Sequence, residues 1–187
     1  KTTENIDKES IISRDKIKNK IYGLIIVRMR SKRLPNKAML NIGGVTAIEH
    51  LIERIKQSKN LNKIILCTTK NEEDNKLVDI AIKNGIYAYR GDANDVLGRM
   101  LGAVKKESPD IIVRITGDDI LVDPDYIDRG LKDHLQKNSE YTDLKSLPSG
   151  TEVEIFNHAL LKDIYLCSDN KNQTEFNVDL NPRYSII

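Results

Sequence analysis

Short apolar runs alternate with segments of helical periodicity along the first two thirds of the chain. Each run is long enough for a buried strand and too short for a core helix. The expected strands are residues 24–27, 63–67, 86–89 and 111–115. In the segments between and after these runs, apolar residues recur every three or four positions, as on one face of a helix. The expected helices are residues 46–58, 72–84, 94–107 and, opened by Pro124, 124 to about 137.

Strands that alternate with helices of this length predict an α/β fold around a mostly parallel, right-handed sheet. Residues 41–44 predict a turn. After residue 139 the pattern loosens, although residues 153–156 alternate as a strand would and residues 159–166 have helical spacing. One α/β domain therefore accounts for most of the chain.

The ends of the chain differ from its middle. Residues 1–20 are polar and highly charged, which is typical of a tail, a linker or the end of a preceding domain. We expect residues 21–187 to form the one folded domain, and we expect the sequence, which does not begin with Met, to be a fragment of a longer protein.

The basic segment that follows the first expected strand is the first candidate for chemistry. Five cations fall within residues 28–37, namely Arg28, Arg30, Lys32, Arg33 and Lys37. Open α/β sheets bind ligands at the carboxyl ends of their strands, and cations mixed with free backbone amides there suit a polyanion such as a triphosphate. A solvated basic loop is the alternative interpretation.

Residues 116–119, Thr-Gly-Asp-Asp, follow the fourth expected strand in the same way. If both strands are central, the cations and carboxylates face each other at one edge of the sheet. This combination suits Mg²⁺-nucleotide chemistry, because carboxylate oxygens hold the metal and cations neutralise the remaining phosphate charge. Asp118 on its own could equally be a turn or N-cap residue, and Asp123 before Pro124 is expected to be an N-cap.

Two further acidic stretches have weaker signals. Residues 91–99 form a turn into a helix, which Asp92, Asn94 or Asp95 could cap. Glu152 and Glu154 stand two positions apart, and so on one face of a strand. Such a carboxylate pair favours either a polyhydroxylated ligand or an exposed strand face.

The amino-acid composition indicates a folded globular protein and gives no sign of a membrane-spanning or nucleic-acid-binding one. With 39% hydrophobic and 31% charged residues, the chain is a folded globular type, and its net charge of +2 gives no reason to expect a nucleic-acid partner. No apolar stretch is long enough to span a membrane, no signal peptide is visible, and the two cysteines match no metal spacing. Cys67 is expected in the core, the three histidines on the surface, and the protein in the cytoplasm.

Taken together, several stretches resemble the cytidylyltransferase family that makes activated sugars, and most closely its spore-coat polysaccharide biosynthesis branch. They occur in the family's order over about residues 22–160. The matching stretches are residues 28–37, 68–74, 89–99, 114–118, 123–124 and 150–154. The phosphate-loop pattern GxxxxGK[ST] and the dinucleotide pattern GxGxxG are both absent from the sequence.

The resemblance implies a Rossmann-like, three-layer nucleotidyltransferase fold. It implies attack of a sugar oxygen on the α-phosphate of a CTP-type nucleotide, with Mg²⁺ and release of pyrophosphate. The same resemblance implies that Asp118 binds the metal and that Glu152 and Glu154 face the sugar. Catalytic roles fall to Arg28, Arg33, Lys37 and Asp118, and the nucleotide is expected to lie against Val27, Arg28, Arg33, Lys37, Arg114, Thr116, Gly117 and Asp118. A homodimer is expected by analogy alone.

The sequence also departs from the family pattern. Residues 117–120 read Gly-Asp-Asp-Ile, without the usual proline and with an added carboxylate. The Arg-Xaa-Thr-Val-Asp segment that supplies a second metal carboxylate in the family is missing, and residues 177–179 are a weak substitute. Two alternatives therefore stay open: an enzyme that uses GTP or another NTP with a sugar 1-phosphate, and a non-catalytic nucleotide-binding regulatory domain.

Overall fold

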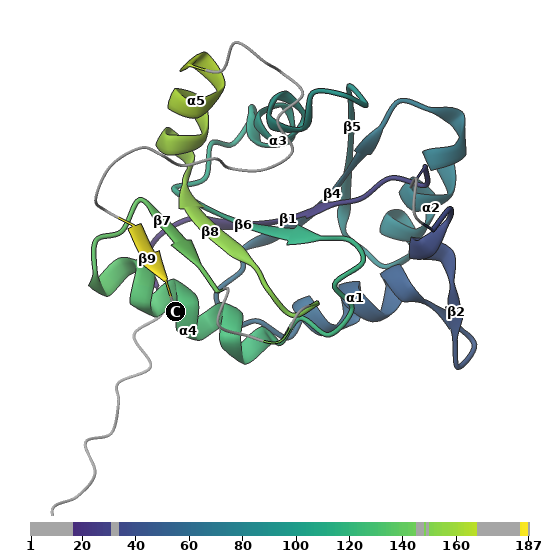
Figure 1. The fold of residues 1–187 in the computed structure, drawn as a ribbon, viewed down its shortest axis with the longest axis horizontal. Helices are drawn as coiled ribbons and strands as arrows, with labels where there is room; N and C mark the ends of the chain where they lie inside the picture. Colours follow the sequence, from purple (N-terminus) through teal and green to yellow (C-terminus); the bar gives the residue numbers. More distant parts are fainter. Residues whose placement is uncertain (1–16, 31–33, 145–147, 149, 168–183, 187) are drawn as a thin grey trace, which may run out of the picture.

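In a computed structural model of the chain, the structure describes residues 17–30, 34–144, 148, 150–167 and 184–186. A seven-stranded sheet runs through its centre in the order β5-β4-β1-β6-β8-β7-β9. These strands are β1 (Ile21–Ile26), β4 (Lys63–Thr69), β5 (Tyr87–Gly91), β6 (Ile111–Thr116), β7 (Tyr141–Asp143), β8 (Glu154–Asn157) and β9 (Tyr184–Ile186). The sheet separates two layers of helices (Figure 1), which confirms the predicted three-layer α/β class.

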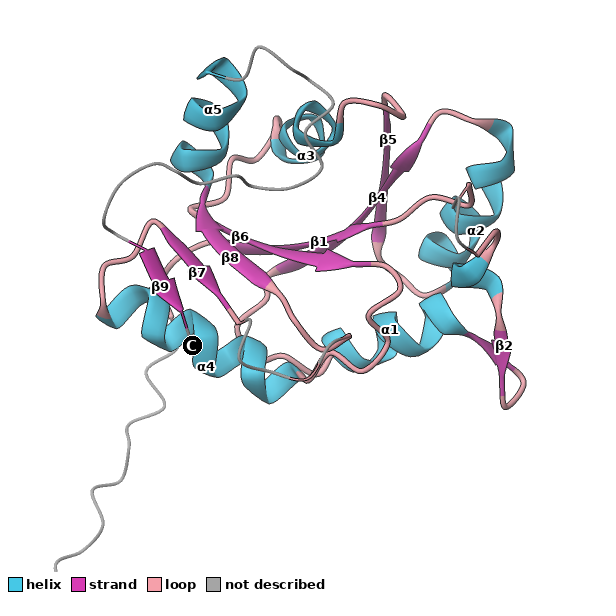
Figure 2. Cartoon of the chain, viewed as in Figure 1, coloured by secondary structure: helices cyan, strands magenta, loops and turns pink. Residues whose placement is uncertain are grey.

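The two helix layers cover opposite faces of the sheet. Helices α1 (Ala47–Ile55), α2 (Asn75–Lys83) and α4 (Pro124–Gln136) lie on one face, and α3 (Val96–Val104) and α5 (His158–Cys167) lie on the other (Figure 2). Strand β1 packs against both helix layers. Its residues Ile21 and Ile25 pack in the cluster with α1, α2 and α4, whereas Tyr22 and Leu24 pack in the cluster with α3 and α5. A strand buried on both faces has to be apolar at nearly every position.

The four predicted strands form a parallel block. Strand β1 pairs in parallel with β4 on one side and β6 on the other, and β4 pairs in parallel with β5. The last part of the sheet is different, because β8 runs antiparallel to both β6 and β7. The prediction of a mostly parallel sheet is confirmed, but the short strand β7 was not recognised in the sequence.

Short elements complete the fold. The expected turn at residues 41–44 is the tip of a hairpin, in which Gly43 and Gly44 both have positive φ between β2 (Asn41–Ile42) and β3 (Val45–Thr46). This conformation is the one that two-residue hairpins require. The 3₁₀ turns are η1 (Lys37–Met39) and η2 (Glu72–Asp74), so the predicted helix over residues 72–84 begins as a 3₁₀ turn. Among the described residues, no helix has the length and apolar character that crossing a bilayer demands.

The histidines correct one prediction. His134 and His158 were expected on the surface, but both are buried. On α4, His134 shares a helix face with Ile127 and Leu131, and its ring contacts the Thr142 hydroxyl at 2.9 Å. Burial lowers the pKa of both histidines. The helical spacing of His134 could have revealed its burial from the sequence, whereas Cys67 lies in the core as expected.

Candidate functional site

The carboxyl ends of β1 and β6 bring the two charged segments together. These strands are parallel neighbours, and Ile26 at the end of β1 lies opposite Thr116 at the end of β6. The amide of Gly117 then donates to the Ile26 carbonyl at 3.0 Å, which extends the pairing by one residue. The chain therefore leaves both strands at the same edge of the sheet, where open α/β folds bind ligands.

The basic segment starts from this edge. The Val27 amide donates to the Cys67 carbonyl at 3.2 Å, so the chain still follows β4 after β1 has ended. Arg28 and Arg30 are exposed, and Arg28 donates to the Ala93 carbonyl at 3.3 Å. Arg33, expected to bind the triphosphate, lies outside the described residues. The described cations of this segment thus lie at the ligand-binding edge.

The contact between Lys37 and Asp118 is the centre of the candidate site. Lys37 begins the 3₁₀ turn η1, and its ammonium group forms an ion pair and hydrogen bond with the Asp118 carboxylate. The two residues are 81 positions apart in the sequence. Their side chains are 26% and 34% exposed, so both groups remain accessible to a ligand. Cation and carboxylate meet at one edge, as the sequence predicted.

Gly117 allows this close approach. A Cβ atom added at Gly117 would lie 2.5 Å from the Cβ of Val27, closer than side-chain atoms can pack. No larger residue fits here unless the two segments move apart. Gly117 and Val27, both expected beside the nucleotide, are therefore brought into direct contact.

Asp119 adds a second carboxylate to the site. Burial, followed by the charges of Asp118 and Glu152, raises the pKa of Asp119 to about 6, against smaller opposing effects of Thr116 and Lys37. Glu152 is thus close enough for its charge to act on Asp119. Asp118, Asp119 and Glu152 thus bring three carboxyl groups close together, and the Lys37 ammonium partly offsets their mutual repulsion.

The carboxylates of the site are of a kind that could hold a divalent cation. Carboxylate oxygens are hard ligands of the kind that Mg²⁺ prefers. Within the described part of the chain, however, no group of three or more acidic, histidine or cysteine side chains is arranged to hold a metal ion unaided. Mg²⁺ is commonly bound by one or two carboxylates together with substrate phosphates, and Asp118 offers one such carboxylate.

Only one of the two glutamates lies in a strand, although both were predicted to. Strand β8 begins only at Glu154, and Glu152 lies before it. The Glu152 carboxylate accepts a hydrogen bond at 2.9 Å from the amide of Gly150, a residue with positive φ. Glu152 therefore belongs to the turn before β8, from which its charge still acts on Asp119.

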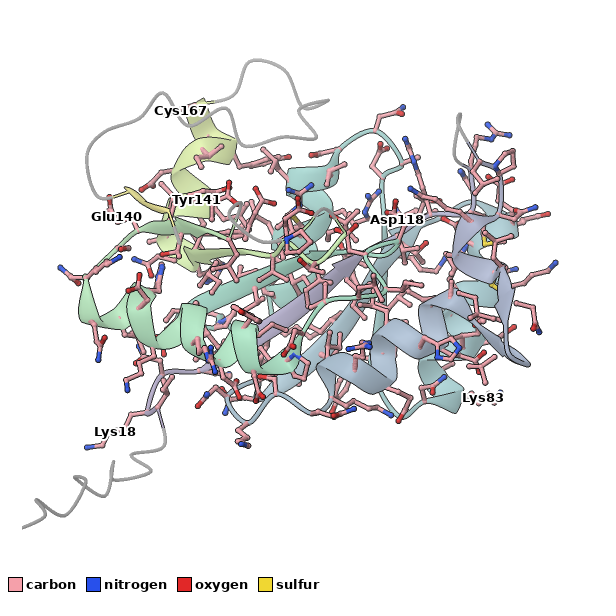
Figure 3. All side chains as sticks on the ribbon, turned by 60° about the horizontal axis from the view of Figure 1, so that its bottom comes forward. Lys18, Lys83, Asp118, Glu140, Tyr141 and Cys167 are labelled. Carbon is pink, nitrogen blue, oxygen red and sulfur yellow. The ribbon has the colours of Figure 1, made fainter. Side chains whose placement is uncertain are left out.

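Glu154 belongs to a second group of polar residues. It forms an ion pair with Arg114 of the neighbouring strand β6, and it accepts a hydrogen bond from the Tyr141 hydroxyl at 2.5 Å. Arg114 precedes the end of β6 by two residues, so this group lies further back along the sheet than Asp118. Figure 3 shows Asp118 and Tyr141 in separate parts of the molecule. Tyr141 was not recognised from the sequence because its strand was not predicted.

The segment at residues 91–99 contacts the basic segment through Arg28. Among the three candidates for capping α3, Asp95 is the residue that does so, accepting from the Gly98 amide at 2.7 Å. Asp123 likewise caps α4, as expected. Arg99, which sequence analysis passed over, is only 3% exposed and donates to the Asp92 carbonyl at 2.8 Å. It holds in place the loop that Arg28 contacts.

Comparisons with known proteins identify the family of the chain. The family model described as Cytidylyltransferase matches residues 22–178. An uncharacterised protein of Methanocaldococcus jannaschii is 39% identical over 83% of the chain and 64% of its own length. The spore coat polysaccharide biosynthesis protein SpsF of Bacillus subtilis is 32% identical over 87% of the chain and 69% of its own length.

The solved structures include a close match in fold. A cytidylyltransferase from Leptospira borgpetersenii superimposes with a TM-score of 0.83 and 32% sequence identity, covering 90% of the chain and 76% of the matched structure. The chain spans about two thirds of the length of the two curated relatives named above. The family model nevertheless covers the whole of the described site. On this evidence, the chain belongs to the cytidylyltransferase family.

Proposed function

We propose that the protein activates a sugar by transferring a cytidylyl group from CTP, with Mg²⁺ and release of pyrophosphate, in cell-surface polysaccharide or glycan biosynthesis. The observation that carries the proposal is the pairing of Lys37 with Asp118 at the carboxyl ends of β1 and β6. Membership of the cytidylyltransferase family supports CTP as the nucleotide. The name of the Bacillus subtilis relative supports a role in polysaccharide synthesis.

The site residues have complementary roles in this proposal. Arg28 and Lys37 neutralise the triphosphate, Asp118 holds the metal, and Arg33 joins the cations on the strength of the family resemblance. The Lys37 ammonium is paired with Asp118 in the structure. Binding of the nucleotide gives Lys37 a phosphate oxygen in exchange for the carboxylate, which leaves Asp118 to the metal. A bound Mg²⁺ supplies positive charge at the phosphate oxygens.

The proposed reaction requires no nucleophile from the protein. A sugar oxygen forms a bond to the α-phosphorus, the bond from that phosphorus to the pyrophosphate oxygen breaks, and the acceptor oxygen releases its proton. Such transfers depend mainly on positioning and on stabilising charge. The chain's part is then to hold the triphosphate against the loop after β1 and to keep the acceptor in line.

The remaining candidates divide between nucleoside and sugar. We place Thr116, Gly117 and Val27 beside the nucleotide, because they lie at the joined ends of β1 and β6. Glu152 and Glu154 are proposed to accept hydrogen bonds from sugar hydroxyls. Glu154 also forms an ion pair with Arg114. The family resemblance places Arg114 near the nucleoside, so we propose that Glu154 lies between the sugar and the nucleoside.

We also propose a cytoplasmic protein that forms a homodimer. A reaction that uses CTP draws on a cytoplasmic nucleotide pool, which favours that location. The homodimer follows by analogy with other α/β nucleotidyltransferases, many of which pair through the irregular C-terminal part of the domain.

Calorimetric titration of the chain with CTP, GTP, UTP and ATP, each with and without Mg²⁺, tests the proposal. We expect CTP to bind most tightly and to require Mg²⁺ for full affinity. Asp118→Asn should remove the Mg²⁺ dependence and abolish pyrophosphate release, because the metal loses its carboxylate ligand. Asp79→Asn, at an exposed position on α2, is the matched control and should leave both unchanged.

Three results would contradict the proposal. Tighter binding of GTP, UTP or ATP than of CTP would reject CTP as the substrate. Binding of none of the four would remove the nucleotide site altogether. Mg²⁺-dependent binding that persists in Asp118→Asn would remove Asp118 from the metal site.

A further inference from the structure

Residues 68–74 match the family pattern but have no role in the site described above. Asp74 ends this segment, and its side chain is completely buried. It immediately precedes helix α2, yet its carboxylate makes no capping hydrogen bond to that helix. A buried carboxylate is costly unless hydrogen bonds satisfy both of its oxygens. The partners of Asp74 therefore indicate what it does.

The two carboxylate oxygens of Asp74 face different segments. Oδ2 accepts hydrogen bonds from the Thr68 hydroxyl at 2.8 Å, from the Thr69 amide at 3.0 Å and from the Thr69 hydroxyl. Oδ1 accepts from the backbone amide of Met29 at 2.8 Å. One side chain thus joins the carboxyl end of β4 to the basic segment after β1.

The electrostatics of Asp74 agree with an ionised, fully bonded group. Burial by itself would raise the pKa of its carboxyl. The hydrogen bonds from Thr69, Met29 and Thr68 outweigh burial, so the pKa lies below its usual value. A charged carboxylate that accepts several hydrogen bonds makes stronger bonds than a neutral group would.

Met29 is the point at which the basic segment is fastened. Its side chain is buried, it lies between the exposed Arg28 and Arg30, and its carbonyl accepts from the Asn36 amide at 3.1 Å. Asn36 has a positive φ of 58° and leads directly into Lys37. Both backbone groups of Met29 are therefore used, one to hold Asp74 and the other to close the segment in front of Lys37.

We infer that Asp74 is a positioning residue that holds the described parts of the basic segment, residues 28–30 and 34–37, in the arrangement that binds the nucleotide's triphosphate. The side chain of Asp74 is completely buried, and it acts through Met29 and Asn36 on the placement of Arg28 and Lys37. Side chains that must converge on a ligand bind it more tightly when the backbone holds them in place beforehand. This inference rests on the proposed function, since it assigns the triphosphate to that segment.

The test compares two variants that lose different bonds of the same carboxylate. Asp74→Asn cannot satisfy the donors on both sides, whereas Thr68→Val removes one donor on the β4 side and leaves the bond to Met29. Both variants should lower the thermal unfolding temperature. Only Asp74→Asn should weaken binding of Mg²⁺-CTP to the folded protein, by about tenfold or more, as expected from loss of a charged hydrogen bond that orders the site.

Amide hydrogen exchange gives a second readout that does not depend on nucleotide binding. In Asp74→Asn, the amides of Met29 and Asn36 should exchange faster, while the amide of Val27, which bonds to the Cys67 carbonyl, should not change. If Asp74→Asn fails to fold, the wild-type chain still decides the matter, because a Met29 amide held by Asp74 has to be protected.

Each outcome supports or overturns a separate statement. Equal CTP affinity in wild type and Asp74→Asn, equal weakening in both variants, or an unprotected Met29 amide would overturn the positioning role. If wild-type protein binds no nucleotide while the Met29 and Asn36 amides behave as expected, the anchoring by Asp74 stands. The proposed function and the triphosphate assignment are then rejected.

Discussion

At the scale of single residues, the site depends on how closely two segments approach. The contact between Gly117 and Val27 lets the chain after β6 lie against the chain after β1. Because of that contact, the carboxylate that follows Gly117 can meet Lys37. A missing side chain is therefore as important to the site as the charged groups themselves.

Gly117→Ala tests this requirement. The added methyl would lie 2.5 Å from the Val27 Cβ, so the two segments have to separate. We expect a loss of about 1–3 kcal/mol of unfolding free energy, the usual cost of overpacking, together with weaker binding of Mg²⁺-CTP. Denaturant unfolding and calorimetry measure the two effects.

Gly23→Ala on β1 is the matched control for that substitution. There the nearest atom to the added methyl is the flexible end of the Leu61 side chain, at 3.1 Å. The control should cost less stability and leave the nucleotide affinity unchanged. If both variants behave alike, close packing at Gly117 has no special role.

At the scale of elements, helix α1 shows how local sequence and distant contacts combine. Thr46 and Glu49 form a capping box at its start, and Lys83 of α2 forms an ion pair with Glu49 at 2.9 Å. The hydrogen bonds from Thr46, and then that from Lys83, lower the pKa of Glu49 to about 2 from 4.5. The ionised carboxylate therefore stabilises the folded state.

Glu49→Gln should make the stability less dependent on pH. A carboxyl group whose pKa is lower in the folded state contributes stability above the unfolded pKa and loses it as the pH falls through the folded value. We expect a loss of about 1 kcal/mol at pH 7, typical of a disrupted cap. The difference from wild type should fade between about pH 4.5 and pH 2.

Denaturant unfolding of wild type and Glu49→Gln across that pH range measures the difference in unfolding free energy. Glu53→Gln is the control on the same helix, because Glu53 is 61% exposed and pairs with its neighbour Lys56. It should change stability little at any pH. A difference between wild type and Glu49→Gln that stays constant down to pH 2 would show that Glu49 acts without its charge.

At the scale of the whole molecule, the site joins segments from several parts of the sheet. The chain after β1, the chain after β6 and the turn before β8 supply Lys37, Asp118 and Glu152. A ligand that contacts all three should therefore stabilise the fold as a unit. This expectation is independent of which sugar the protein uses.

Thermal unfolding in the presence of Mg²⁺-CTP tests that coupling. At a free ligand concentration of 100 times the dissociation constant, binding should add about 2.7 kcal/mol to the unfolding free energy. For a domain of this size the midpoint should rise by roughly 5–10 °C. Mg²⁺ alone, or CTP with a chelator, should give much smaller shifts. Equal shifts without Mg²⁺ would argue against a metal-linked site.

Much of the architecture follows from local patterns. The apolar runs identified the parallel strands because strands buried on both faces need apolar residues throughout. The capping role of Asp123 was predicted because it stands just before Pro124 and a helical pattern, whereas Asp95 was one of three candidates for capping α3. The convergence of the basic segment and Asp118 followed from the rule that parallel strands end at one edge of a sheet.

The sequence by itself thus determined the α/β class, the family and the two charged segments of the site, because these depend on periodicity and on order along the chain. Only the tertiary structure decided which groups meet. The burial of His134, the hydrogen bond from the Met29 amide to Asp74 and the ion pair of Lys37 with Asp118 arise from contacts between residues distant in sequence. Local patterns carry no information about such contacts, since their partners are chosen by how the layers pack.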